Sequence, residues 1–217
     1  MKKIEFELSD ELYKKASSPI RNKEDLLMLL AYTIKFLITN GNVDNNSIAY
    51  DKKLVLYVDK MSRVFFSLHN KIFSFCFPFS INIPQDNHKI SIKYKGYFEF
   101  DNISSSLLLS ILEQNDIISD TFENIGEKIF EIILYNEWES IDYNGFCDLI
   151  KGLMMFEPGY IRYDYDPEHA SEELHPLHHL DVFYSSNCTA KLGLKDNIDI
   201  EWLIDLLNIR TKCKYVD

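Results

Sequence analysis

Segment 23–39 limits the possible folds most, because it predicts a helix that is apolar nearly all round. Asn22 precedes the segment as an N-cap, acidic residues occupy its first turn, and Asn40-Gly41 follows it as a stop signal. The segment contains Lys35 and falls short of the roughly 18–20 uncharged apolar residues of a membrane span. We therefore expect this helix to be buried inside a globular protein.

The chain of 217 residues is long enough for one large domain or two small ones. Its 15 Phe and 13 Tyr argue against disorder, and no linker is visible, so a single α+β domain over 1–217 is expected. Acidic residues near the start interrupt the apolar run that a signal peptide needs, and the four cysteines form no C-x-x-C pair. These features favour a cytoplasmic protein with reduced thiols and no membrane association.

The charge balance limits the choice of partners. With 23 Lys+Arg against 34 Asp+Glu, the formal net charge is −11, which repels a phosphate backbone at long range. The surface as a whole is therefore unsuited to non-specific duplex binding. A local site could still accept a nucleotide or nucleic acid, particularly where a bound cation reverses the local charge.

The rest of the chain mixes helical and extended patterns. Segment 47–83 is rich in aromatic and β-branched residues and fits either a helix or a strand, whereas 88–100 alternates around Lys95-Gly96 and predicts a hairpin. The remaining predicted elements are helices at 104–113, 122–135, 143–155 and 199–209 and strands at 160–165, 180–184 and 188–194. We expect an α+β fold whose N-terminal two-thirds is rich in helices, followed by a C-terminal antiparallel β-meander and a closing helix.

A functional site is predicted within residues 158–209, because four of the six histidines lie between 169 and 179. The period of a strand places Arg162 and Asp164 on one face, and His179 and Asp181 on one face of a second strand. Pairing of the two strands would bring these side chains together, with His175 arriving from the loop between them.

Aspartates and neutral imidazoles are ligands for divalent ions, and an arginine fork holds phosphate. We therefore predict a site for Mg, Mn or Zn, with Asp164, His175, His179 and Asp181 as ligands. Asp164, His179 and Arg162 are the predicted catalytic residues, and Arg162 and Asn187 are the predicted substrate contacts.

Three other interpretations remain open. Arg162 and Asp164 could form a buried structural pair with the histidines on a surface loop. A histidine held by an aspartate could act as acid or base without a metal. Cys188 could be a nucleophile, although a small buried thiol is the simpler interpretation.

The motifs Arg162-Tyr-Asp-Tyr-Asp-Pro, His175-Pro-Leu-His-His179-Leu and Ser186-Asn187-Cys188 resemble a bacterial family known only as a domain of unknown function. The family pattern is R-[FY]-[DE]-Y-D-P, H-P-x-x-H-L and N-C-R. This chain has Thr189 in place of the arginine, and Asp181-Val182-Phe183 where threonine or histidine followed by glycine often stand. The resemblance implies no established activity. Families with such a sporadic distribution often belong to phage-defence or toxin–antitoxin loci.

The first hypothesis is a bacterial defence protein that acts as a metal-assisted phosphodiester or nucleotide hydrolase, similar to a nuclease. The alternative is a non-catalytic subunit that binds an ATPase, a nuclease or a toxin through an acidic, aromatic-rich surface.

Overall fold

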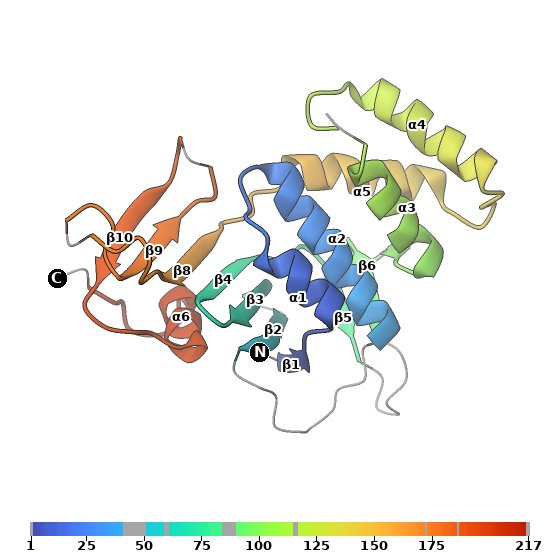
Figure 1. Ribbon diagram of the computed structural model, residues 1–217. Helices are drawn as coiled ribbons and strands as arrows, with labels where there is room; N and C mark the ends of the chain where they lie inside the picture. Colours follow the sequence, from blue (N-terminus) through green and yellow to red (C-terminus); the bar gives the residue numbers. More distant parts are fainter. Residues whose placement is uncertain are drawn as a thin grey trace. The chain divides into compact units, whose positions relative to one another are not determined.

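The structure is a computed structural model of the chain (Figure 1). It describes residues 2–40, 51–58, 61–83, 90–114, 117–171, 173–185 and 187–215. The chain divides into two compact units. Unit 1 comprises Met1–Leu8, Asn46–Cys76 and Pro158–Asp217, and unit 2 comprises Ser9–Asn45 and Phe77–Glu157. The organisation as a single domain over 1–217 stays a prediction.

Unit 1 contains a seven-stranded sheet in which every neighbouring pair of strands is antiparallel. In spatial order the strands are β1 (Lys2–Glu7), β2 (Lys52–Val58), β3 (Arg63–Leu68), β4 (Lys71–Cys76), β8 (Ile161–Tyr165), β9 (His178–Val182) and β10 (Ala190–Leu194). Helix α6 (Ile200–Leu207) follows the last strand. Both ends of the chain therefore contribute strands to one sheet.

The two faces of this sheet differ in character. One face packs against α6 in an apolar core that includes Phe65, Tyr163, Leu180 and Leu203. On the other face, β1 to β4 carry buried apolar side chains, among them Phe73, whose ring stacks on Phe66 at 4.8 Å. The same face becomes polar toward β8, β9 and β10, where the predicted site lies.

Unit 2 contains five helices and a three-stranded sheet among its described residues. The helices are α1 (Asp10–Ser17), α2 (Lys23–Asn40), α3 (Asn102–Leu112), α4 (Phe122–Tyr135) and α5 (Tyr143–Met155), and the strands are β5 (Ser80–Asn82), β6 (Ser91–Tyr94) and β7 (Phe98–Glu99). The burial predicted for α2 is confirmed: it contacts α1, α3 and β6, and Leu26, Leu30 and Leu37 are fully buried. Asn22 caps its start, accepting the Asp25 N–H at 2.8 Å.

The predicted hairpin is formed by β6 and β7. Lys95 and Gly96 both have positive φ angles, +48° and +80°, and the Tyr97 N–H bonds the Tyr94 carbonyl at 3.3 Å. This is the geometry of a type I′ turn, whose twist suits a two-residue hairpin loop. The first residues of the predicted segment, His88 and Lys89, lie outside the described residues.

The predicted layout of a helix-rich N-terminal two-thirds and a C-terminal β-meander is wrong. The described residues form six helices and ten strands, and seven strands, β1 to β7, precede α3 in the sequence. Where segment 47–83 is described, it forms strands β2 to β5. Strands β2 to β4 are interior strands with long runs of buried residues, so they lack the alternation that reveals a half-exposed strand.

None of the helices in the described ranges is long and apolar enough to cross a membrane.

We expect Phe73→Ala to lower the free energy of unfolding by about 3–5 kcal/mol, because it removes a fully buried ring and leaves a cavity. Urea unfolding followed by circular dichroism measures the change. Tyr135→Ala is the control, because this ring is 89% exposed. Equal destabilisation by the two variants would contradict the prediction.

Candidate functional site

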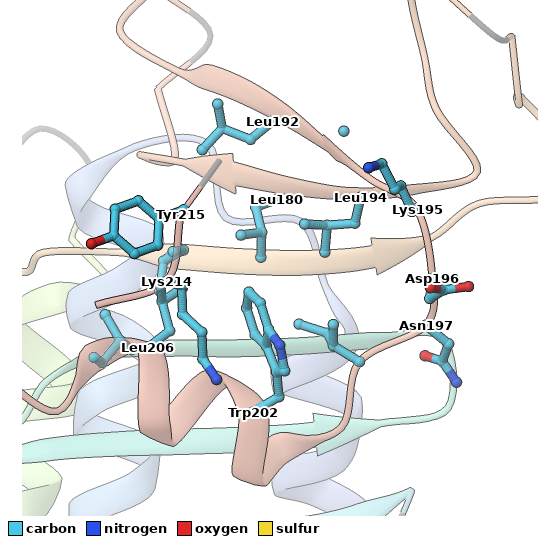
Figure 2. Close-up of a pocket in the computed structure, with 14 residues that line it drawn as sticks. Leu180, Leu192, Leu194, Lys195, Asp196, Asn197, Trp202, Leu206, Lys214 and Tyr215 are labelled. Carbon is cyan, nitrogen blue, oxygen red and sulfur yellow. The ribbon is translucent and has the colours of Figure 1, made fainter. Parts of the chain in front are cut away.

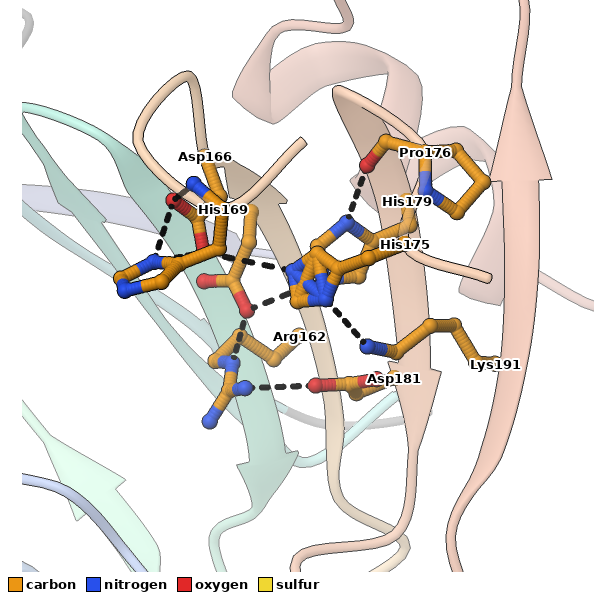
Figure 3. A network of polar contacts seen from close by, with 9 residues as sticks. Arg162, Asp166, His169, His175, Pro176, His179, Asp181 and Lys191 are labelled. Atoms are coloured by element: carbon orange, nitrogen blue, oxygen red, sulfur yellow. Dashed lines mark hydrogen bonds and ion pairs between the residues drawn. The ribbon is translucent and has the colours of Figure 1, made fainter. Parts of the chain in front are cut away.

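Strands β8 and β9 bring together the four residues that were predicted to converge, which are Arg162, Asp164, His179 and Asp181. In their antiparallel register Asp164 lies opposite His179, and Arg162 lies opposite Asp181. Side chains of opposed residues project from the same face of a sheet, and Figure 3 shows Arg162, His179 and Asp181 converging. The predicted convergence of Arg162, Asp164, His179 and Asp181 is confirmed.

The neighbouring strands extend this pairing into two rows of side chains across the sheet. Strand β4 places Lys71 opposite Asp164, and β10 places Lys191 opposite Asp181. The rows are Lys71, Asp164, His179 and Gly193, and then Phe73, Arg162, Asp181 and Lys191. In these rows the basic side chains of Lys71, Arg162 and Lys191 lie next to the carboxylates of Asp164 and Asp181.

Arg162 joins the two carboxylates. Its Nε donates to Asp164 Oδ2 at 2.6 Å and its Nη2 donates to Asp181 Oδ2 at 2.5 Å, while the third nitrogen points away from both (Figure 3). Burial disfavours the charged guanidinium, but its interactions with Tyr160, Asp164 and Asp181 raise the pKa of Arg162 above its ordinary value. Burial raises the pKa of the adjacent Tyr160 to about 12. Arg162 therefore holds both carboxylates in place as a permanent cation.

His179 is buried and oriented by the loop before it. Its Nδ1 lies 2.8 Å from the Pro176 carbonyl, which only accepts, so Nδ1 carries a hydrogen. In the neutral ring, Nε2 then presents a lone pair, and it lies 3.6 Å from Asp164 Oδ2. His179 Nε2 and Asp164 Oδ2, which also accepts from Arg162 Nε, could share a proton or a metal cation.

Gly193 supports this orientation. A Cβ atom at Gly193 would lie 3.0 Å from Pro176 Cγ, so only glycine leaves Pro176 its full space. Pro176 in turn accepts the hydrogen bond from His179. A backbone carbonyl on the second nitrogen of an imidazole is the usual support of a histidine that binds a metal.

Three residues of the site can offer ligand atoms to one cation. Ligand atoms of Asp164, His179 and Asp181 lie within 4.8 Å of one another. Asp181 Oδ1 is buried and has no hydrogen-bond partner among the described residues. Two carboxylates and an imidazole form a donor set that suits Mg, Mn or Zn.

His175, the fourth predicted ligand, lies beside this group of three. Its ring packs edge-on against His179, with centroids 4.6 Å apart. Its Nδ1 lies 3.1 Å from Lys191 Nζ and its Nε2 lies 3.2 Å from Asp166 Oδ2. Its Nε2 is buried and has no hydrogen-bond partner among the described residues, although Asp166 faces it.

The motif around Asn187 lies between β9 and β10. Asn187 is exposed, and its backbone N–H bonds Ser185 Oγ at 3.4 Å. Cys188 is exposed, so the interpretation as a buried thiol is wrong. Ser186 lies outside the described residues.

An apolar pocket lies on the opposite face of the sheet (Figure 2). It has a volume of about 490 Å³ and lies between α6 and the strands β8 to β10, with Leu180, Leu194 and Trp202 among its walls. Leu180 stands between His179 and Asp181 in the sequence, so the strand period turns it away from them. The apolar pocket and the charged side chains therefore lie on opposite faces of the sheet, and Gly193 of β10 borders both.

Comparisons with protein-family models, curated proteins and solved structures found no match for this chain.

Sequence reasoning missed Lys71, Lys191, Pro176 and Gly193. Lys191 and Gly193 are two residues apart in a predicted strand, so their common face could have been noticed. Lys71 joins the site only because β4 pairs with β8, and no local pattern reveals that pairing.

We expect Arg162→Met to lower the free energy of unfolding by about 3–5 kcal/mol, because it leaves two largely buried carboxylates without their cation. Urea unfolding at neutral pH measures the loss. Lys95→Met, which breaks an exposed pair with Asp148, should change little. The triple variant Arg162→Met/Asp164→Asn/Asp181→Asn should recover part of the loss, and no recovery would contradict this cause.

The lowered pKa of Lys71 predicts that the stability of the protein depends on pH. Burial, and then the nearby charge of Arg162, lower the pKa of Lys71 to about 8 from its ordinary value of 10.5. Between these values the unfolded state binds a proton that the native state has lost, so stability rises with pH. We expect the wild type to gain stability relative to Lys71→Met from pH 8 to pH 10, in urea titrations with EDTA. Parallel pH curves would contradict the shift.

Proposed function

We propose that this chain is a hydrolase of phosphate esters, a nucleotide or a phosphodiester, that uses a divalent cation held by Asp164, His179 and Asp181. The observation that carries the proposal is the buried Asp181 Oδ1, which lacks a hydrogen-bond partner among the described residues and belongs to a group of potential ligands within 4.8 Å. A cation there would satisfy that oxygen and the His179 Nε2 lone pair together. When bound, a divalent cation polarises a phosphoryl oxygen or activates water.

The residues around this group fit an anionic substrate. Lys71 and Lys191 flank the carboxylates on the same face of the sheet, and Arg162 lies between them. With Asp166, which faces His175 at 3.2 Å, the three cations balance three carboxylates. A divalent cation at the site would therefore make it locally positive toward a phosphate group in a chain of net charge −11.

Arg162 has a positioning role in this proposal. Its Nε and Nη2 hold the two carboxylates, and its guanidinium also interacts with the buried Tyr160 hydroxyl, so Arg162 contributes mainly its charge toward a phosphate. His175, whose ring contacts His179, lines the same region. The Arg162 and His175 motifs resemble a bacterial family of sporadic distribution. Because such families are often associated with defence loci, the resemblance supports a role in a cytoplasmic defence system.

A second candidate needs no metal. His179 faces Asp164 at 3.6 Å, so a protonated His179 could act as a general acid on a nucleotide. Turnover that persists in EDTA would favour this mechanism. A role as a binding subunit is a third proposal, carried by a surface of unit 2.

The test begins with metal binding by the protein after EDTA treatment and desalting. Titration calorimetry with Mn²⁺, Mg²⁺ and Zn²⁺ should show binding near one ion per chain in the wild type. Asp181→Asn and His179→Asn should each weaken it about tenfold or more, because each removes a ligand. His69→Asn, an exposed histidine outside the site, is the matched control and should bind as the wild type does.

Hydrolysis is then measured with bis(p-nitrophenyl) phosphate and a nucleotide panel. The wild type should require the metal, and both site variants should be inactive while remaining folded by circular dichroism. Equal metal binding by all proteins, or the absence of binding with every ion, would overturn the metal site.

A further inference from the structure

Helix α4 in unit 2 has an apolar face wider than its neighbours cover. The helix contacts α3 and α5, and only Ile125 and Ile129 are buried. Phe122, Phe130 and Leu134 remain 44%, 52% and 60% exposed. Together with Gly126 they recur every four residues, which forms one continuous stripe along the helix, and we call it the α4 stripe.

The α4 stripe contains a hollow at its only small residue. Tyr143 of α5 lies below Gly126, with its hydroxyl donating to the Gly126 carbonyl at 3.3 Å. A Cβ atom at Gly126 would lie 3.1 Å from that hydroxyl, so the glycine lets Tyr143 approach α4 closely at the base of the hollow. The pocket here has a volume of about 420 Å³ and is bordered by Phe122 and Phe130. A groove between two helices with such a hollow fits an apolar side chain of a third helix.

Acidic side chains border the same groove. Glu123, Glu127 and Glu131 follow the stripe at the same four-residue spacing, and all three are exposed. Lys128 is paired with Asp120 at 2.7 Å, and Lys151 lies over the Phe122 ring at one end of the stripe. The long border of the stripe is therefore acidic.

We propose that the α4 stripe binds an amphipathic helix of another protein, with an apolar face flanked by Lys or Arg. The apolar stripe and its hollow supply the buried contact, and the three glutamates select a basic partner. A second copy of this chain fits less well, because its own stripe carries the same acidic border and its net charge is −11. This proposal concerns unit 2 alone and does not depend on the metal site.

The probe is a fluorescent helical peptide of Leu, Ala and Lys with one apolar face, and its counterpart has Glu in place of Lys. Binding is followed by anisotropy. The Lys peptide should bind the wild type and the Glu peptide should not. Phe130→Ser and Glu123→Gln/Glu127→Gln/Glu131→Gln should each weaken binding by about tenfold, and the triple variant should also reduce the salt dependence.

Matched controls distinguish binding at the α4 stripe from nonspecific hydrophobic or electrostatic binding elsewhere on the surface. Tyr135→Ser removes an exposed ring off the stripe, and Glu7→Gln/Glu11→Gln/Glu139→Gln makes the same charge change elsewhere. Both controls should bind within about twofold of the wild type. The proposal is overturned by no binding of the Lys peptide, by equal losses in the controls, or by a wild-type dimer in light scattering that Phe130→Ser dissociates.

Discussion

The ion pairs of Arg162 with Asp164 and Asp181 determine how the C-terminal part of the sheet is built. A largely buried guanidinium requires both carboxylates, which come from adjacent strands, so β8 and β9 have to pair in one register. A slip of one residue would turn these charges into the core against α6, where Tyr163 and Leu180 pack. Charge pairing on one face and apolar packing on the other thus specify the same register. The candidate site is therefore part of what stabilises the sheet.

The geometry of the site could be predicted because its two strands are half-polar. In β8 and β9, charged and apolar residues alternate, and that period reveals which side chains share a face. The prediction needed only that the two strands pair, which their closeness in the sequence favours. Lys71 could not be found in this way. It lies far away in the sequence and reaches the site through the pairing of β4 with β8.

The fold as a whole could not be predicted either, because its central strands pair with segments that are distant in the sequence. Helices that are predicted from caps and periodicity, such as α2, α4 and α5, form within one residue of their predicted bounds. The interior strands β2 to β4 are buried for most of their length and therefore show no alternation. Their pairing with β8 joins segments separated by most of unit 2, and the hydrophobic pattern contains no information about such distant partners.

The distribution of charge limits the substrate within the proposed function. The three cations of the site act over short distances, because salt screens exposed charges beyond about 8–10 Å. At longer range an extended polyanion interacts with the whole chain, whose net charge is −11. A single nucleotide is small enough to reach the site without approaching the acidic remainder, whereas a long duplex is not. The charge pattern therefore favours a nucleotide, or a short single-stranded end, over internal positions of a duplex.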